Sequence, residues 1–125
     1  MPRTRVLFFK DDDGTVPLLK WLDSLNEKAQ DKCAVKIERL AELGHDLRRP
    51  EADLLRDGIY ELRTHLGHVQ YRLLYFFHGN TAVVISHGIT KESAVPPREV
   101  DRAIVRRSKF LKAPERHTWS QSHGG

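Results

Sequence analysis

Three strand-like runs follow one another in the second half of the chain, with only short turns between them. Residues 58–66, 69–78 and 81–89 are rich in valine, isoleucine, tyrosine and phenylalanine, which favour the extended backbone of a strand. Gly67-His68 and Gly79-Asn80 separate the runs, and both pairs suit the two-residue turns of β-hairpins. Because such turns join antiparallel neighbours, we expect an antiparallel meander at the centre of the fold.

The elements on either side of this meander complete the expected fold. They are a first strand over residues 3–10, a helix that Thr15 caps, a second helix from Ser24 to about residue 43, and a third helix from Pro96-Pro97. Residues 45–57 form an irregular polar connection in this interpretation. The order β-α-α-β-β-β-α predicts an α+β fold, in which an antiparallel sheet packs against two N-terminal helices and a C-terminal helix follows.

The second predicted helix is amphipathic and ends at Gly44. Its narrow apolar stripe consists of Ala29, Cys33, Ile37, Leu40 and Ala41, and charged residues occupy the other sides. This pattern is typical of a helix that lies on a sheet. Cys33 falls within the stripe, so we interpret it as a packing residue rather than a reactive thiol.

Length and composition predict one ordinary globular domain. The 125 residues are 39% hydrophobic and 30% charged, and we expect the domain to span residues 1–112, with a disordered polar tail over 113–125. A single cysteine excludes an internal disulfide. The apolar run Val6–Phe9 is too short for a signal peptide or a membrane span, so we expect a cytoplasmic protein without a membrane association.

Charge is distributed unevenly along the chain. Residues 1–62 hold 11 Lys/Arg and 13 Asp/Glu, whereas residues 63–125 hold 10 Lys/Arg and 4 Asp/Glu. A surplus of positive charge in one half attracts polyanions, because basic clusters release counterions from a phosphate backbone. A solvated helix with surplus arginines would explain the same numbers.

The two hairpin turns predict which residues face one another across the meander. A two-residue turn at Gly67-His68 sets Arg63 opposite Arg72, and one at Gly79-Asn80 sets Arg72 opposite His87. Like charges placed directly opposite one another destabilise a strand pair by about 0.2–1 kcal/mol. An arrangement with such a local cost often marks a site, and two guanidinium groups with an imidazole suit a phosphate.

Two further residues belong to this predicted phosphate site. Glu61 precedes Arg63 on the same face, where it pairs with an arginine or accepts a proton from a hydroxyl, and Lys91 follows the last strand. Alternatively, these are solvated strand residues and His87 has a structural role, since a one-residue slip would turn Arg72 to the other face. The sequence contains no glycine-rich phosphate loop and no metal-ligand spacing, so we expect neither a cofactor nor a metal.

Several ordered segments carry a resemblance to a known family. They are residues 57–63 (Asp-Gly-Ile-Tyr-Glu-Leu-Arg), 71–76 (Tyr-Arg-Leu-Leu-Tyr-Phe) and 83–88 (Val-Val-Ile-Ser-His-Gly), with 17–22 upstream and Lys91 and 97–103 downstream. Together the set resembles the phage-derived HigB-type branch of the RelE toxin superfamily. The resemblance spans about residues 5–110 and keeps the order of the elements.

The resemblance implies the toxin of a type II toxin–antitoxin system. Such enzymes are metal-independent endoribonucleases that cut messenger RNA, often on the ribosome, and so inhibit translation, and a small helix-turn-helix antitoxin of the HigA kind silences them. The ribose 2′-hydroxyl attacks the adjacent phosphate, and donors aimed at the developing charge contribute about a hundred- to a thousandfold in rate each. By this resemblance Arg72 binds phosphate, and Arg63 and Lys91 occupy basic positions of the family.

This chain also departs from the family pattern. RelE carries lysines where this sequence has Tyr60 and Glu61, and its late catalytic tyrosine has no counterpart after Lys91. The general acid is therefore open between His87 and Lys91. We further expect the arginines of the third helix to bind RNA, namely Arg98, Arg102, Arg106 and Arg107. The alternatives are a ParE-like toxin that acts on DNA gyrase and a non-enzymatic module that binds RNA or the ribosome.

Overall fold

The computed structural model describes residues 3–91 and 94–119. Its elements, in chain order, are β1 (Arg5–Phe9), α1 (Pro17–Asp23), α2 (Glu27–Leu43), a 3₁₀ turn η1 (Gly44–Asp46), β2 (Ala52–Arg56), β3 (Ile59–Leu66), β4 (Val69–His78), β5 (Ala82–Lys91), α3 (Pro97–Lys112) and β6 (Thr118–Trp119). The predicted α+β class and the predicted order of the helices and main strands are confirmed. Two short strands, β2 and β6, join the expected elements.

One six-stranded sheet forms the centre of the molecule, in the order β2-β3-β4-β5-β1-β6. The run from β2 to β5 is antiparallel, as predicted, whereas β1 lies parallel to β5 with Arg5 opposite Ala82. The prediction of a purely antiparallel sheet is therefore wrong at this edge. Two helices and three strands lie between β1 and β5 in the chain, so no tight turn forces this pair of strands to be antiparallel.

Strand β2 lies in the segment that was predicted to be an irregular connection. It pairs with β3 through the two-residue turn Asp57-Gly58, where Asp57 has φ 53° and Gly58 has φ 79°. Both residues thus adopt positive φ, as a type I′ turn requires, and Asp-Gly is among the preferred pairs for it. The Asp-Gly pair could therefore have predicted this hairpin from the sequence. Strand β2 adds Asp53 to the sheet, opposite Glu61.

The C-terminal segment is ordered as far as the structure describes it. Thr118 and Trp119 pair with Phe9 and Phe8 of β1, and the buried ring of His117 stacks on Phe9 at 5.3 Å between centroids. The prediction of a disordered tail is therefore wrong for residues 113–119. Residues 120–125 lie outside the described part of the chain.

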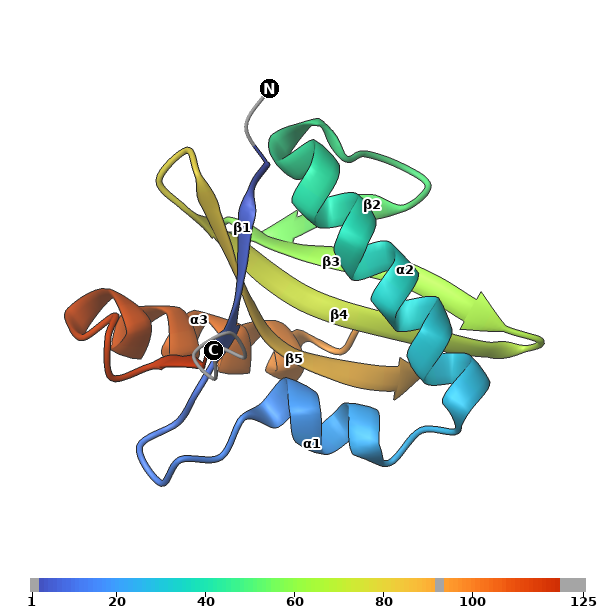
Figure 1. Ribbon diagram of the computed structural model, residues 1–125, viewed down its shortest axis with the longest axis horizontal. Coiled ribbons are helices and arrows are strands. Elements are labelled where there is room, and N and C mark those ends of the chain that lie inside the picture. Colours follow the sequence, from blue (N-terminus) through green and yellow to red (C-terminus); the bar gives the residue numbers. More distant parts are fainter. Residues whose placement is uncertain (1–2, 92–93, 120–125) are drawn as a thin grey trace.

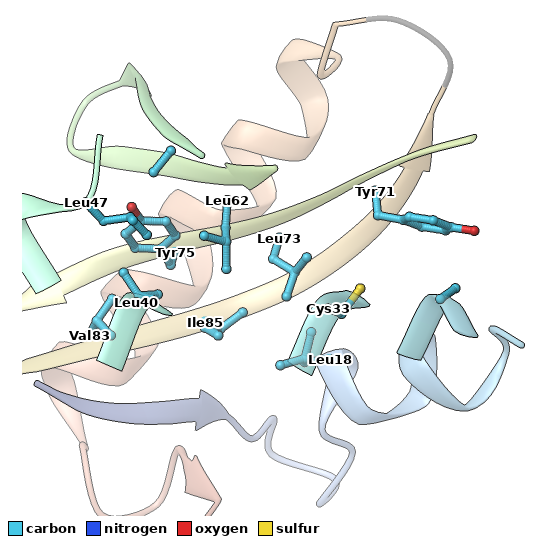
Figure 2. Packing of buried hydrophobic residues seen from close by; sticks show 12 residues of the cluster. Leu18, Cys33, Leu40, Leu47, Leu62, Tyr71, Leu73, Tyr75, Val83 and Ile85 are labelled. Carbon is cyan, nitrogen blue, oxygen red and sulfur yellow. The ribbon is translucent and has the colours of Figure 1, made fainter. Parts of the chain in front are cut away.

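Helices cover both faces of the sheet. Figure 1 shows α2 crossing β3 and β4 on one face, while α3 lies against the other. Figure 2 shows Leu18 of α1 and Cys33 of α2 facing the strands that carry Leu73 and Ile85. Leu74, the neighbour of Leu73, points to the opposite face and packs in the cluster under α3. The alternation along β4 thus divides the core into two layers.

The helices largely follow their sequence signals. Asn26, rather than Ser24, caps α2 by accepting a hydrogen bond from the Ala29 amide at 2.8 Å. The stripe on α2 is confirmed: Cys33 is fully buried, and burial raises the pKa of its thiol to about 11. None of the helices described in residues 3–91 and 94–119 has both the length and the apolar character needed to cross a bilayer.

Candidate functional site

The β3–β4 hairpin places two arginines side by side. Gly67 has φ 61° at the turn, and the register sets Arg63 directly opposite Arg72, as predicted. Leu62 and Leu73, their sequence neighbours, are paired on the face that α2 covers, so both arginines point to the other face. The two-residue turn determines this register locally, which explains why the sequence was sufficient to predict it.

The position predicted for His87 is shifted along the sheet. The β4–β5 loop spans residues 79–81, one residue more than expected, and Ser86 forms a bulge between His87, which pairs with Leu74, and Ile85. Arg72 consequently lies opposite Ile89, not His87. Each change moves the register by one residue, and the two together keep His87 on the arginine face but two residue pairs from Arg72 along the ladder. The predicted row of three is therefore wrong in its third member.

Two carboxylates hold the arginine pair. Glu61, which is 5% exposed, lies between the guanidinium groups, with Oε2 at 2.8 Å from Arg63 Nε and Oε1 at 3.2 Å from Arg72 Nε. Asp53 of β2 approaches Arg63 Nη2 at 3.3 Å. The repulsion expected between opposed like charges is offset by this network. Glu61 thus acts here as the counter-ion of both arginines.

The pair nevertheless keeps N–H groups for a ligand. Arg72 Nη1 donates to Gln70 Oε1 and to the Tyr71 carbonyl, both at 3.2 Å. Among the described residues, Arg63 Nη1 and Arg72 Nη2 make no hydrogen bond. Guanidinium groups with free N–H donors recognise phosphate oxygens in a fork. The arrangement can therefore hold a phosphate without losing Glu61.

A basic surface pocket of about 540 Å³ includes this pair. Its lining combines α2, the loop before β2 and the paired ends of β3 and β4, namely Lys32, Val35, Lys36, Pro50, Glu51, Arg63, Thr64, His65, Gln70 and Arg72. Lys32 and Lys36 were not among the predicted site residues. Their spacing of four residues on a helix was visible, but only the packing of α2 on the sheet brings them to the same pocket, on the opposite face from the arginine side chains.

His87 occupies a separate, buried position. Its Nδ1 lies 2.7 Å from Ser86 Oγ, and its Nε2 lies 3.0 Å from Glu99 Oε1 of α3. Burial and the nearby Arg106 lower the pKa of His87 to about 4, against the opposing effect of Glu99. His87 is thus neutral near pH 7, with both ring nitrogens engaged within the fold.

Lys91 lies at the border of the arginine pair. It ends β5 opposite Gln70, the residue whose amide oxygen accepts from Arg72. Gln70 and Arg72 share a face of β4, so Lys91 lies on that face as well. His87 and Lys91 lie equally far along β5 from Ile89, the partner of Arg72, but His87 is buried against Glu99, whereas Lys91 is partly exposed.

The four α3 arginines do not form one surface. Arg98 and Arg102 are exposed beside Glu99, and Arg102 Nη1 donates to Glu99 Oε1 at 3.0 Å. Arg106 is half-buried over the ring of Phe9, and Arg107 turns away to the carbonyl of Asp57. Within the described ranges, the structure contains no cluster of three or more His, Cys, Asp or Glu residues that could hold a metal ion.

A family model places the chain among known proteins. The model described as Phage derived protein Gp49-like (DUF891) matches residues 20–108, which include α2, the whole β2–β5 meander and most of α3. A comparison with curated proteins found no significant match. The matched range contains both arginines, Glu61, His87 and Lys91.

Proposed function

The chain belongs to the phage-derived Gp49-like family, a family of toxin-like proteins, and from this premise we propose that it is the ribonuclease toxin of a toxin–antitoxin pair. We propose a HigB-type, metal-independent endoribonuclease whose substrate is messenger RNA, free or on the ribosome. Its activity would inhibit translation in the cytoplasm, and its inhibitor would be a helix-turn-helix antitoxin of the HigA kind.

One observation carries the proposal: Arg63 and Arg72 lie side by side with free N–H groups. They line a pocket that also contains Lys32, Lys36 and His65. The two guanidinium groups would bind one backbone phosphate, and adjacent nucleotides would find the further positive charge of Lys32 and Lys36 on the α2 face. The surplus of basic residues after position 62 fits the same polyanionic substrate.

The proposed reaction needs only the chain, the RNA and solvent water. The 2′-hydroxyl loses its proton to water, its oxygen forms a bond to the adjacent phosphorus, the bond to the 5′-oxygen breaks, and the products carry a 2′,3′-cyclic phosphate and a 5′-hydroxyl. Arg72 and Arg63 stabilise the charge that develops on the phosphate oxygens. Glu61 holds both guanidinium groups in position, and Lys91 is the more accessible candidate to protonate the leaving oxygen, since His87 is buried.

A second candidate is a toxin that binds its target without cutting RNA, as a ParE-like gyrase toxin or an RNA-binding or ribosome-binding module would. The pairing of Arg63 and Arg72 with Glu61 and Asp53 favours it, because arginines held by carboxylates can serve the fold alone. DNA damage signalling without loss of messenger RNA would identify a gyrase toxin. Salt-sensitive RNA binding without cleavage products would identify a binding module.

Inducible expression in bacteria, with mapping of RNA ends, tests the proposal. We expect the parent chain to arrest growth and to generate new 5′-hydroxyl ends, and Arg72→Ala to reduce cleavage at least about a hundredfold. Arg3→Ala is the matched control, because Arg3 forms an exposed pair with Glu38, neither residue lines the pocket, and the substitution removes the same charge. A folded Arg72→Ala protein that cleaves RNA like the parent would refute the mechanism.

A further inference from the structure

A second surface pocket lies where β1 leaves the sheet. It has a volume of about 510 Å³ and is lined by the β1–α1 loop, α1, β5 and α3, namely by Asp11, Asp13, Thr15, Pro17, Lys20, Trp21, Ser24, His87, Gly88, Arg102 and Arg106. It shares no lining residue with the pocket of Arg63 and Arg72. Arg102 and Arg106 of α3 therefore belong to a separate pocket.

Three cationic side chains and two carboxylates line this second pocket, which leaves a small surplus of positive charge. Lys20, Arg102 and Arg106 line it, and they come from two helices that lie on opposite faces of the sheet. The lining carboxylates already have partners: Asp11 accepts from Lys109 Nζ at 2.9 Å, and Asp13 accepts from the Thr15 amide at 2.9 Å. Arg102 pairs with Glu99, whereas Asp11 and Glu99 attract Arg106 without a hydrogen bond to it among the described residues.

Arg106 is an incompletely satisfied cation. Its Nη1 is buried and has no hydrogen-bond acceptor within the residues that the structure describes, although its guanidinium lies 5.8 Å from the centre of the Phe9 ring. Burial lowers the pKa of Arg106, and the adjacent positive charge of Arg102 lowers it further. A buried charged donor without an acceptor is costly, and an anion bound beside Arg102 and Arg106 would offset the repulsion between their charges.

We propose that this pocket binds a phosphate group, held between Arg102 and Arg106, with Lys20 at its rim and Trp21 as one wall. The inference goes beyond the proposed cleavage reaction. It assigns a second anion site, in the pocket that His87 lines and away from the pocket of Arg63 and Arg72, and this site requires no catalysis. Since His87 is neutral and faces Glu99, it contributes shape rather than charge. The phosphate belongs either to nucleic acid or to the free inorganic ion, and the chemistry of recognition is the same.

Nuclear magnetic resonance of the intact chain tests this site. The sequence has two tryptophans, Trp21 in the pocket and Trp119 on β6, so their indole N–H signals are an internal comparison. Titration with inorganic phosphate should move the Trp21 signal and leave that of Trp119 in place. The titration is carried out on Arg72→Ala protein, so that the outcome does not depend on the proposed catalytic pocket.

Two substitutions in that background measure the contribution of the arginines. Arg102→Gln and Arg106→Gln should each weaken phosphate binding about tenfold, the loss expected for one charge-assisted hydrogen bond. Lys112→Gln, an exposed change of the same charge on the last turn of α3, should leave the affinity unchanged. Arg106→Gln removes a half-buried side chain, so this variant could fail to fold. Arg102 is half-exposed, so Arg102→Gln should fold in either case and keeps the test decisive.

Short DNA oligonucleotides distinguish the source of the phosphate. A trinucleotide with a 5′-phosphate and the same trinucleotide with a 5′-hydroxyl are titrated in parallel. Binding of both supports a backbone phosphodiester as the natural ligand, and binding of the phosphorylated one alone supports a terminal monoester. A Trp21 signal that no probe moves, or an Arg102→Gln protein that binds phosphate within about twofold of its parent, would overturn the proposal.

Discussion

At the scale of single residues, the molecule contains buried ionisable side chains whose charge is handled in two different ways. Glu61 lies between Arg63 and Arg72, so positive and negative groups balance at short range. His87 instead is kept neutral, because burial and Arg106 disfavour its protonated form. The first arrangement can accept a further anion, whereas the second stabilises the contact between β5 and α3.

The neutral state of His87 predicts a dependence of stability on pH. Its pKa in the folded chain is lowered from the ordinary histidine value of 6.5 to about 4, so the unfolded chain binds the proton more readily between these values. The stabilisation is therefore fully present above pH 6.5 and is lost as the pH falls toward 4, by about 2 kcal/mol between pH 7.5 and pH 5.

Urea unfolding at several pH values measures this loss. His87→Gln should be less stable than the parent at pH 7.5, and its free energy of unfolding should change less between pH 7.5 and pH 5. The comparison isolates His87, because the other titrating groups are common to both proteins. Parallel curves for the two proteins would contradict the assignment of a depressed pKa.

At the scale of elements, α1 depends on one glycine of its neighbouring strand. A Cβ atom at Gly88 would lie 2.1 Å from Trp21 Cε3, and the Trp21 indole donates to Thr90 Oγ1 at 3.2 Å. The bulge at Ser86 turns Gly88 toward α1 and His87 toward α3. The seven-residue helix α1 thus packs on β5 through the Trp21 ring as well as through the buried Leu18.

Gly88→Ala should therefore destabilise the fold by about 1–3 kcal/mol, because the added methyl group overlaps the Trp21 ring and forces it to move. Urea unfolding followed by tryptophan fluorescence measures the change. The double variant Gly88→Ala/Trp21→Leu is the control, and it should lose less stability relative to Trp21→Leu alone. If Gly88→Ala were as stable as the parent, α1 would not be held by this contact.

At the scale of the whole molecule, the uneven charge of the chain becomes two basic pockets. The half after residue 62 supplies Arg63 and Arg72 to one pocket and Arg102 and Arg106 to the other. The half before it supplies lysines to both, from α2 and from α1. Folding thus brings basic residues of both halves of the sequence together in each pocket.

Binding of RNA should accordingly depend on salt. A 2′-O-methyl RNA cannot undergo the proposed 2′-attack, so its affinity can be followed by fluorescence anisotropy from about 50 to 200 mM salt. Arg63→Ala should reduce the slope of log affinity against log salt by about one, since one phosphate contact is lost. Arg3→Ala should leave the slope unchanged, and an equal slope for Arg63→Ala would exclude Arg63 as a phosphate ligand.

The limits of sequence-based prediction follow the range of the interactions. Arg63 and Arg72 were placed correctly because a two-residue turn sets their register over ten residues of chain. His87 was misplaced because the longer loop and the bulge at Ser86 respond to packing on both faces of β5. Strand β2 was missed although Asp57-Gly58 signalled its turn, and β6 was missed because a two-residue strand has no pattern of its own.

Turn chemistry and apolar periodicity act between neighbours in the chain, so they were sufficient to predict the α+β class, the order of the main elements and the adjacent arginine pair. Long-range packing, in contrast, sets the parallel direction of β1 beside β5, the contact of His87 with Glu99, and the lining of each pocket by lysines of α1 or α2 and arginines of later elements. These contacts join distant segments, and their geometry depends on how all the layers pack at once.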